Sequence, residues 1–290
     1  MKHEFVQDGR AGVLVLFALL ALPSYAVGQA AAEGYSWENS TELSFVSTGG
    51  NASSSTLGLG STLIAKDRVN SFKVVLGGIR GETTFRTLSA TGTATAFTVN
   101  ETTDSKLTAG SYFVRGRYDR ALSKTFVFSG AGWDRNTFAG VQNRYALVVG
   151  IGRTWTEGET NRFKTDLGGT YTVQKDVDPA PGVDEGFGGV RLSMDAMRKV
   201  SANATLTSTL IIDQNVEDTD DLRADWINSL TMSFSERLAF KTSLQLLYDK
   251  APSLLPVRLF DAGGIDTGTT VLTPGENIDS ILTLTMVIKM

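Results

Sequence analysis

The sequence predicts an all-β fold, namely a closed antiparallel up-and-down transmembrane β-barrel of about twelve strands. Three observations point to it. From residue 37 to the C-terminus, apolar and polar side chains alternate with a period of two, which is typical of half-buried strands. The connections between these segments alternate between short and long. Aromatic residues lie near the ends of the segments, as they do at the two interfaces of a membrane.

Residues 1–30 are predicted to be a cleaved secretory signal peptide. Met1 to Arg10 is polar, Ala11 to Leu22 is an unbroken apolar run, and small residues follow Pro23. This order matches the three regions of a signal peptide. A membrane anchor is the alternative, but the run is shorter than the roughly 20 residues that a spanning helix needs. We expect residues 31–290 to form a barrel in the cell outer membrane of a Gram-negative bacterium.

The first predicted strand, residues 37–46, shows the alternation clearly. Leu43 and Phe45 occupy one face, which suits lipid, whereas acidic and serine side chains occupy the other. The same pattern predicts twelve segments of about the length that a tilted membrane strand needs. They are residues 37–46, 56–65, 72–77, 112–118, 125–133, 145–152, 163–173, 190–195, 204–212, 223–234, 238–249 and 278–290. Segment 125–133 is the least regular of them.

The lengths of the connections differ between the two ends of the predicted barrel. The connections assigned to the periplasm are short: 66–70, 120–124, 156–161, 197–201 and 235–237. Those on the other side are mostly longer: 82–105, 135–141, 174–185, 214–221 and 250–277, with the short turn 47–52 as the exception. Short periplasmic turns and long outer loops are typical of bacterial outer-membrane barrels. The aromatic residues near strand ends are Trp37, Trp133, Tyr145, Trp155, Tyr171, Trp226, Phe234 and Tyr248.

A soluble β-sandwich that binds a ligand in the periplasm is the alternative fold, because its strands would also alternate. It would not require an even number of strands or loops that are long on one side only. In a barrel the final strand, 278–290, must pair with the first, because lipid does not tolerate an open sheet edge.

Two short stretches resemble a known family. One is Thr48, Gly50 and Asn51 in the first turn. The other runs from Trp133 and Asp134 through Arg144 to Gly150 and Gly152. Together they resemble the salt-induced outer-membrane protein family, also described as the domain of unknown function 481, from Trp37 to the C-terminus. The resemblance implies an outer-membrane barrel, suggests a link to envelope stress, and supplies no activity. The long insertions 82–105 and 250–277 depart from the family pattern.

Catalytic chemistry is restricted by what the chain lacks. Its one His is His3, inside the predicted signal peptide, and it has no Cys. A Ser-His-Asp triad, a Cys nucleophile and a His-ligated metal are therefore excluded from the mature chain. We expect a non-enzymatic protein without a cofactor. A glycosidase with two carboxylates remains open, and the loop acids Asp176, Asp178, Asp184 and Glu185 are its candidates, although solvated loop charges are the simpler interpretation.

A second acidic cluster suits hard divalent cations such as Ca²⁺, although its spacing matches no EF-hand. Its members are Asp213, Glu217, Asp218, Asp220 and Asp221. The alternative is that these carboxylates are simply solvated. The net charge of −4, which the predicted cleavage leaves unchanged, argues against nucleic acid as a partner. The expected partners are outer-membrane lipid and lipopolysaccharide and, during biogenesis, periplasmic chaperones and the barrel assembly machinery.

Charged side chains on the polar faces are predicted to line the lumen. They are Glu42, Lys73, Arg115, Arg117, Lys164, Asp166, Arg191, Arg223, Asp225, Lys241 and Asp279. They either pair with one another and fill a narrow barrel, or line a water-filled path. Twelve strands lie between the 8 or so that side chains fill and the 16 to 18 or so that leave a channel. We expect a narrow or plugged lumen in a structural or stress-related protein, with a passive diffusion channel as the alternative.

Two long connections are predicted to carry structure of their own. Residues 82–99 are expected to form a hairpin above the membrane, with its tip at Ser89 to Gly92. Residues 254–260 are apolar, and they are expected either to fold inward as a plug or to extend a strand against its neighbour.

Overall fold

The computed structural model describes residues 34–48, 52–93, 96–179, 185–260 and 262–289. The chain divides into two compact units, Met1–Ser36 and Trp37–Met290. The predicted signal peptide, residues 1–30, lies outside the described residues. Among the residues that are described, no helix is long and apolar enough to cross a membrane.

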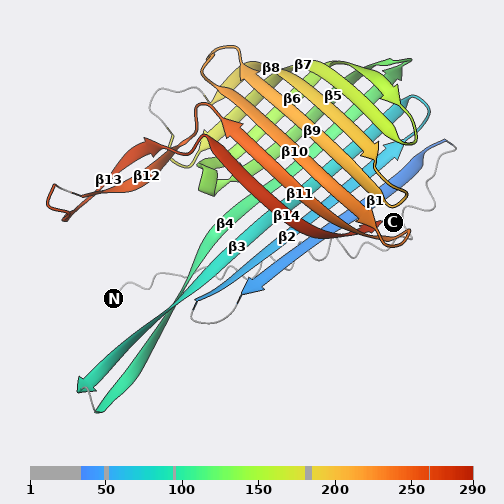
Figure 1. The fold of residues 1–290 in the computed structure, drawn as a ribbon. Coiled ribbons are helices and arrows are strands. Elements are labelled where there is room, and N and C mark those ends of the chain that lie inside the picture. The colour runs from blue at the N-terminus through green and yellow to red at the C-terminus, as the bar shows by residue number, and fades with distance from the viewer. Residues whose placement is uncertain (1–33, 49–51, 94–95, 180–184, 261, 290) are drawn as a thin grey trace, which may run out of the picture. The chain divides into compact units, whose positions relative to one another are not determined.

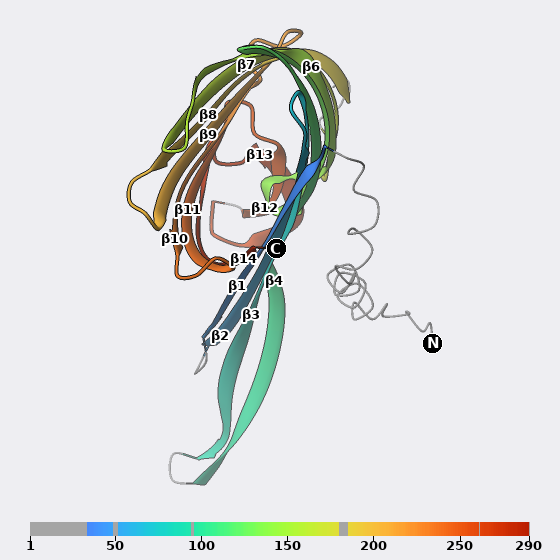
Figure 2. The same cartoon turned by 90° about the vertical axis from the view of Figure 1, so that its right-hand side faces the viewer.

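Twelve strands form one closed antiparallel barrel, which confirms the predicted fold class (Figure 1). Around the barrel the order is β1-β14-β11-β10-β9-β8-β7-β6-β5-β4-β3-β2. Closure joins the first strand to the last through pairs such as Glu42 with Val287. The strands are β1 Ser36–Thr48, β2 Ala52–Lys66, β3 Asn70–Thr93, β4 Ala96–Leu122, β5 Thr125–Asn136, β6 Val141–Glu157, β7 Asn161–Asp176, β8 Gly186–Lys199, β9 Ala204–Asn215, β10 Leu222–Ser233, β11 Leu238–Asp249 and β14 Ile278–Lys289. Figure 2 shows these strands curving around a common centre.

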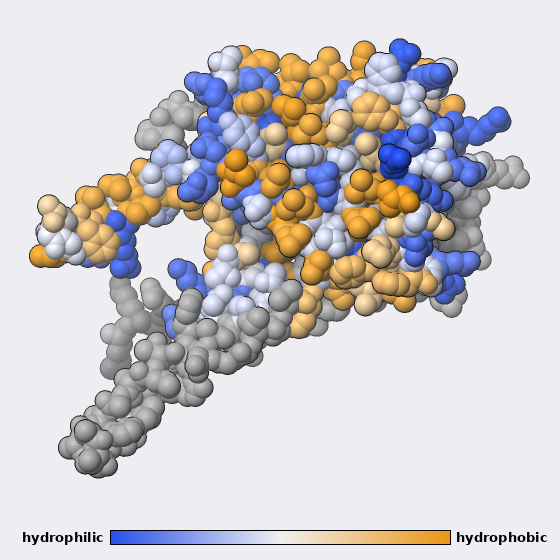
Figure 3. All heavy atoms as spheres, in the orientation of Figure 1, coloured by the Kyte–Doolittle hydropathy of each residue, from blue (hydrophilic) through white to orange (hydrophobic). Residues whose placement is uncertain are grey.

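The apolar side chains of the strands point away from the barrel. Val149 is 64% exposed and Leu282 is 68% exposed, although both lie in the middle of their strands. Strand register places such residues side by side, as with Leu147 and Tyr171. Apolar side chains gather over the barrel wall in Figure 3. Apolar side chains on the outside of a barrel are favourable in lipid and unfavourable in water.

The five connections predicted to be periplasmic all lie at one end of the barrel and are two to four residues long. They are residues 67–69, 123–124, 158–160, 200–203 and 234–237. The tightest turn has two residues, and it places Ser123 at a φ of 65°, in the left-handed region. At the other end, residues 137–140 include the 3₁₀ helix η1 Thr137–Ala139, and 177–185 and 216–221 are irregular.

The long hairpin between β3 and β4 differs from its prediction in one detail. The two strands pair beyond a bulge at Gly81 and continue as far as Thr93 with Ala96. The predicted tip at Ser89 to Gly92 is therefore wrong, because Ser89 pairs with Asn100 inside the ladder. Sequence alternation gives no signal for where a hairpin turns when its tip lacks a strong turn motif.

The connection 250–277 contains a small sheet of its own. β12 Leu254–Phe260 pairs with β13 Asp266–Pro274, and this hairpin is a separate two-stranded sheet. Residues 254–260 thus do not extend a barrel strand, and from Pro256 onward they are exposed rather than buried in a plug. The base of the hairpin does reach across the barrel end. A Cβ placed on Gly140, between β5 and β6, would lie 3.5 Å from Leu255 Cδ2.

Candidate functional site: the barrel lumen

The inward face of the wall carries the charged residues. Register places Lys73 opposite Arg117, and Asp213 between Arg191 and Arg223. We call the part of the lumen nearer the short turns the turn half, and the part nearer the long connections the loop half. All eleven predicted lumen residues lie on inward-facing rows of these strands, and the structure groups most of them into ion pairs.

Arg115 joins opposite walls at the middle of the lumen. Its Nη2 lies 2.6 Å from Asp134 Oδ1 on the neighbouring strand β5, and its Nη1 lies 3.8 Å from Asp225 Oδ2 on β10. β4 and β10 are six strands apart in either direction around the barrel. Asp225 also accepts a hydrogen bond of 2.8 Å from Gln245 Nε2. The Arg115 side chain stays 41% exposed, so water reaches this constriction.

The turn half contains an aromatic shelf formed by Phe126 and Phe128 of β5. Both rings face inward and are almost fully buried, at 6% and 4% exposed, and they pack with Val148. The Arg117 guanidinium lies 4.0 Å from the centre of the Phe128 ring, which is a cation–π contact. Arg117 also pairs with Asp119 and Asp166, each at 2.8 Å. The shelf therefore holds a charged side chain in a fixed place inside the lumen.

Other predicted lumen residues in this half fall into two groups. Lys241 Nζ lies 2.7 Å from Glu42 Oε1, which links β11 to β1. Lys164 Nζ instead lies 5.9 Å from the centre of the Phe126 ring. Among the described residues, neither Lys73 nor Lys164 has a carboxylate within ion-pair distance.

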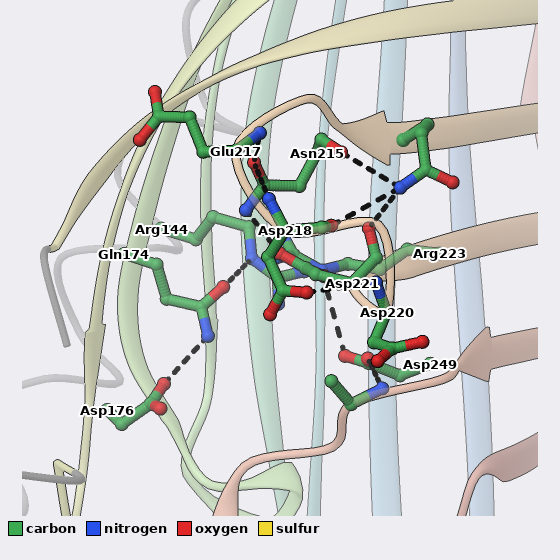
Figure 4. A network of polar contacts seen from close by, with 12 residues as sticks. Arg144, Gln174, Asp176, Asn215, Glu217, Asp218, Asp220, Asp221, Arg223 and Asp249 are labelled. Atoms are coloured by element: carbon green, nitrogen blue, oxygen red, sulfur yellow. Dashed lines mark hydrogen bonds and ion pairs between the residues drawn. The ribbon is translucent and has the colours of Figure 1, made fainter.

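The loop half holds a polar network that converges from several strands (Figure 4). Arg223 of β10 pairs with Asp221 and lies 3.8 Å from Asp249 of β11. Asp221 also accepts a hydrogen bond of 3.1 Å from Asn215 Nδ2. On the facing wall, Arg144 Nε donates to Gln174 Oε1 at 2.7 Å, and Gln174 Nε2 donates to Asp176 Oδ1 at 2.8 Å. Predicted lumen residue Arg191 pairs with Asp213 at 2.7 Å, whereas Asp279 is exposed at the start of β14.

The acidic cluster proposed for cations is divided among different partners. Asp213 binds Arg191, Asp221 binds Arg223, and Asp220 accepts a hydrogen bond of 2.6 Å from Lys250. Glu217 accepts from the Gly188 N–H at 3.0 Å, and Asp218 from the Asp220 N–H at 2.9 Å. Among the described residues, no three acidic side chains come together as a metal site would require. The Asp220–Lys250 hydrogen bond lowers the pKa of Asp220 and raises the pKa of Lys250.

The candidate glycosidase acids lie at the ends of strands β7 and β8 or between them. Asp176 is the last residue of β7 and is bound to Gln174, while Asp178 and Glu185 lie in the following connection. Asp184 lies outside the described residues.

Comparison with known proteins agrees with the sequence resemblance. The family model described as "Protein of unknown function, DUF481" matches residues 41–254. The chain belongs to this family. No curated protein matches the chain.

Solved structures with a similar arrangement are bacterial barrels, at low identity. The NanC porin is 11% identical, with a TM-score of 0.42, and the match covers 88% of this chain and 98% of the porin. An outer-membrane channel from Pseudomonas putida F1, described as COG4313, is 12% identical with a TM-score of 0.42, covering 90% and 97%. An anion-selective porin from Comamonas acidovorans is 11% identical with a TM-score of 0.35, covering 88% and 98%.

The residues that carried the DUF481 resemblance have identifiable roles in the wall. Trp133 Nε1 donates to Asn143 Oδ1 at 3.1 Å, Asp134 binds Arg115, and Arg144 binds Gln174. Gly50 and Asn51 lie outside the described residues.

Gly150 and Gly152 of the same motif lie beneath the aromatic shelf. A Cβ on Gly152 would lie 2.7 Å from Asp166 Cβ, and one on Gly150 would lie 2.8 Å from Phe128 Cε1. Glycine is required at both positions. At Gly152 a Cβ would meet the Phe126 ring, and at Gly150 it would meet the Leu167 carbonyl oxygen as well as the Phe128 ring.

Sequence reasoning missed several lumen residues. Phe126 and Phe128 were part of the least regular segment, and Asp134 and Arg144 were noted only for the family resemblance. Arg162 and Asp195, which pair at 3.2 Å, were also missed. The signal that could have found them is the period-two pattern, extended through the whole of β5, β6, β7 and β8.

Proposed function

We propose that this DUF481 protein is a non-enzymatic outer-membrane barrel whose lumen is a narrow, water-filled pore for small solutes. The observation that carries the proposal is the contact of Arg115 with Asp225 across opposite walls. An open porin would keep opposite walls apart. The absence of His and Cys from the predicted mature chain supports the non-enzymatic assignment. A role in envelope stress stays a prediction.

The outward apolar surface supports the membrane location. Ile151 is 60% exposed and Tyr145 is 55% exposed on the same strand as Val149. In water such a continuous surface would drive aggregation, whereas in lipid it is the favourable contact surface. A soluble periplasmic ligand-binding protein, the alternative, predicts extraction from membranes by sodium carbonate. A membrane barrel predicts that the protein stays in the membrane after this treatment. It also predicts that the mobility of the protein on a gel changes after boiling.

The pore is tested by removing one side of the constriction. Asp225→Ala breaks the link between walls, yet Arg115 keeps Asp134 as its partner, so no lone buried charge remains. We expect the single-channel conductance of the refolded protein in a planar bilayer to rise about twofold or more, because the narrowest level widens.

Glu159→Ala is the matched control, since Glu159 is an exposed acid in the short turn 158–160, outside the lumen. It should leave the conductance unchanged. If neither the wild-type protein nor the Asp225→Ala variant carries a current, the proposed pore is wrong.

A further inference from the structure

The two halves of the lumen carry opposite charge. In the loop half, acids outnumber arginines on the inward rows and the adjoining turn. The acids are Asp134, Asp176, Asp213, Asp221, Asp225, Asp249 and Asp279, and the arginines are Arg144, Arg191 and Arg223. Arg115, at the constriction, separates this half from the next. The loop half is therefore net negative.

In the turn half the balance is reversed. The inward cations are Lys73, Arg117, Arg162, Lys164, Lys199, Lys241 and Lys289, and the inward acids are Glu42, Asp119, Glu157, Asp166 and Asp195. Lys66 and Glu38 at the rim bind one another and cancel. This half is net positive.

Side-chain pairing leaves the surplus charge available to solutes. Glu42, Asp119, Asp166 and Asp195 bind Arg117, Arg162 and Lys241. Among the described residues, no carboxylate lies within ion-pair distance of Lys73 or Lys164. Lys73 even faces Arg117 directly across the β3–β4 ladder, where like charges are unfavourable. The charged groups that act on Lys73 include Arg162 and Asp195, which already bind each other. The exposed Lys73 ammonium group therefore lies next to Arg117 and has no carboxylate partner in the part of the chain that the structure describes.

The constriction brings a passing solute close to charged side chains. Opposite walls meet at 3.8 Å through Arg115 and Asp225. At physiological ionic strength the field of a charge extends about 8 Å before salt screens it. A solute that passes the constriction is therefore within reach of its charges. A cation is attracted in the loop half and repelled in the turn half, and an anion meets the reverse.

We propose that the lumen is a bipolar pore that favours small solutes of zero net charge, zwitterions included, and slows the passage of small cations and anions in series. This selectivity rests on the proposed pore function. A zwitterion can direct its ammonium group toward the loop half and its carboxylate toward the turn half, so each end meets an attractive group.

The test uses three amino acids of similar size that differ in net charge. Proteoliposomes containing the full mature chain are challenged with glutamine, glutamate or lysine, and swelling reports entry. Glutamine should enter several times faster than either charged amino acid. Lys73→Gln with Lys164→Gln should speed the entry of lysine, since the basic barrier is reduced and no ion pair is broken. Lys124→Gln, in the two-residue turn outside the lumen, is the matched control and should change nothing.

The outcomes separate the selectivity from the pore. Entry of all three amino acids at equal rates would overturn the bipolar pore and leave the proposed function intact. Entry of none of them, with no current in bilayers, would overturn both. The same charge arrangement predicts a rectified current, larger when the loop side is positive, because both ion types then accumulate in the lumen. A symmetric current in the wild-type protein would count against the proposal.

Discussion

The loop half and the turn half of the lumen are built on different physical principles. In the loop half, side chains from β6, β7, β9, β10 and β11 meet in hydrogen bonds and ion pairs around Arg223 and Arg144. In the turn half, two phenylalanine rings lie on glycines, and Arg117 stacks on them. Both halves contain ion pairs, and the turn half also has the packed aromatic shelf.

The two halves should be sensitive to different kinds of substitution. Charges that share partners depend on one another, so the removal of one leaves others unpaired. A packed aromatic shelf responds to changes of volume instead. Substitutions of charge should therefore damage the loop half most, and substitutions of size should damage the turn half most.

The largest expected effect is at Arg223 in the loop half. Arg223→Met removes the partner of Asp221 and Asp249, which then face each other in a mostly buried site. We expect a loss of about 3 kcal/mol in the free energy of unfolding, because a mostly buried charge loses its partner. Urea unfolding in detergent micelles measures it. Arg237→Met, in an exposed turn, is the control, and equal midpoints for the two variants would mean that the network does not stabilise this half.

A smaller effect is expected under the aromatic shelf. Gly152→Ala places a methyl group 2.7 Å from Asp166 Cβ and against the Phe126 ring, so the shelf must move. Overpacking of this kind costs about 1–3 kcal/mol. Gly169→Ala on the neighbouring strand is the control, because nothing lies within 4 Å of its added Cβ. If Phe126→Leu does not rescue Gly152→Ala, the contact between ring and glycine is not the cause.

The same contrast explains how much could be predicted from sequence. The barrel was predictable because each outward row is apolar over a long stretch, as with Tyr145, Leu147, Val149 and Ile151 on β6. β5 looked irregular because Phe126 and Phe128 point inward while Val127 points outward, so both faces are apolar. A period-two pattern cannot assign a face when both faces carry the same kind of residue.

The constriction could not be predicted at all. Arg115 and Asp225 were both assigned to the lumen, but their contact depends on strand order, register and tilt around half of the barrel. The inward direction of a side chain is a local property of the sequence, whereas its height in the lumen is set by the shear of the whole sheet. The division into an acidic and a basic half follows only when those heights are known.

The smallest expected effect concerns a charge pair outside the lumen. It tests whether charges outside the lumen also stabilise the loop half. Asp220 and Lys250 bind at 2.6 Å in exposed connections, and each shifts the pKa of the other. Because the pKa of Asp220 is lowered, its contribution to folding stability is present above the ordinary Asp pKa and is lost as pH falls through the lowered value. Because the pKa of Lys250 is raised, its contribution to folding stability is lost only as pH rises through that raised value.

Asp220→Asn should therefore lower the pKa of Lys250, which NMR titration of a labelled lysine measures. It should leave the urea midpoint unchanged at neutral pH, because exposed pairs contribute little to stability. A clear loss of stability in this variant would show that charges outside the lumen also hold the loop half together.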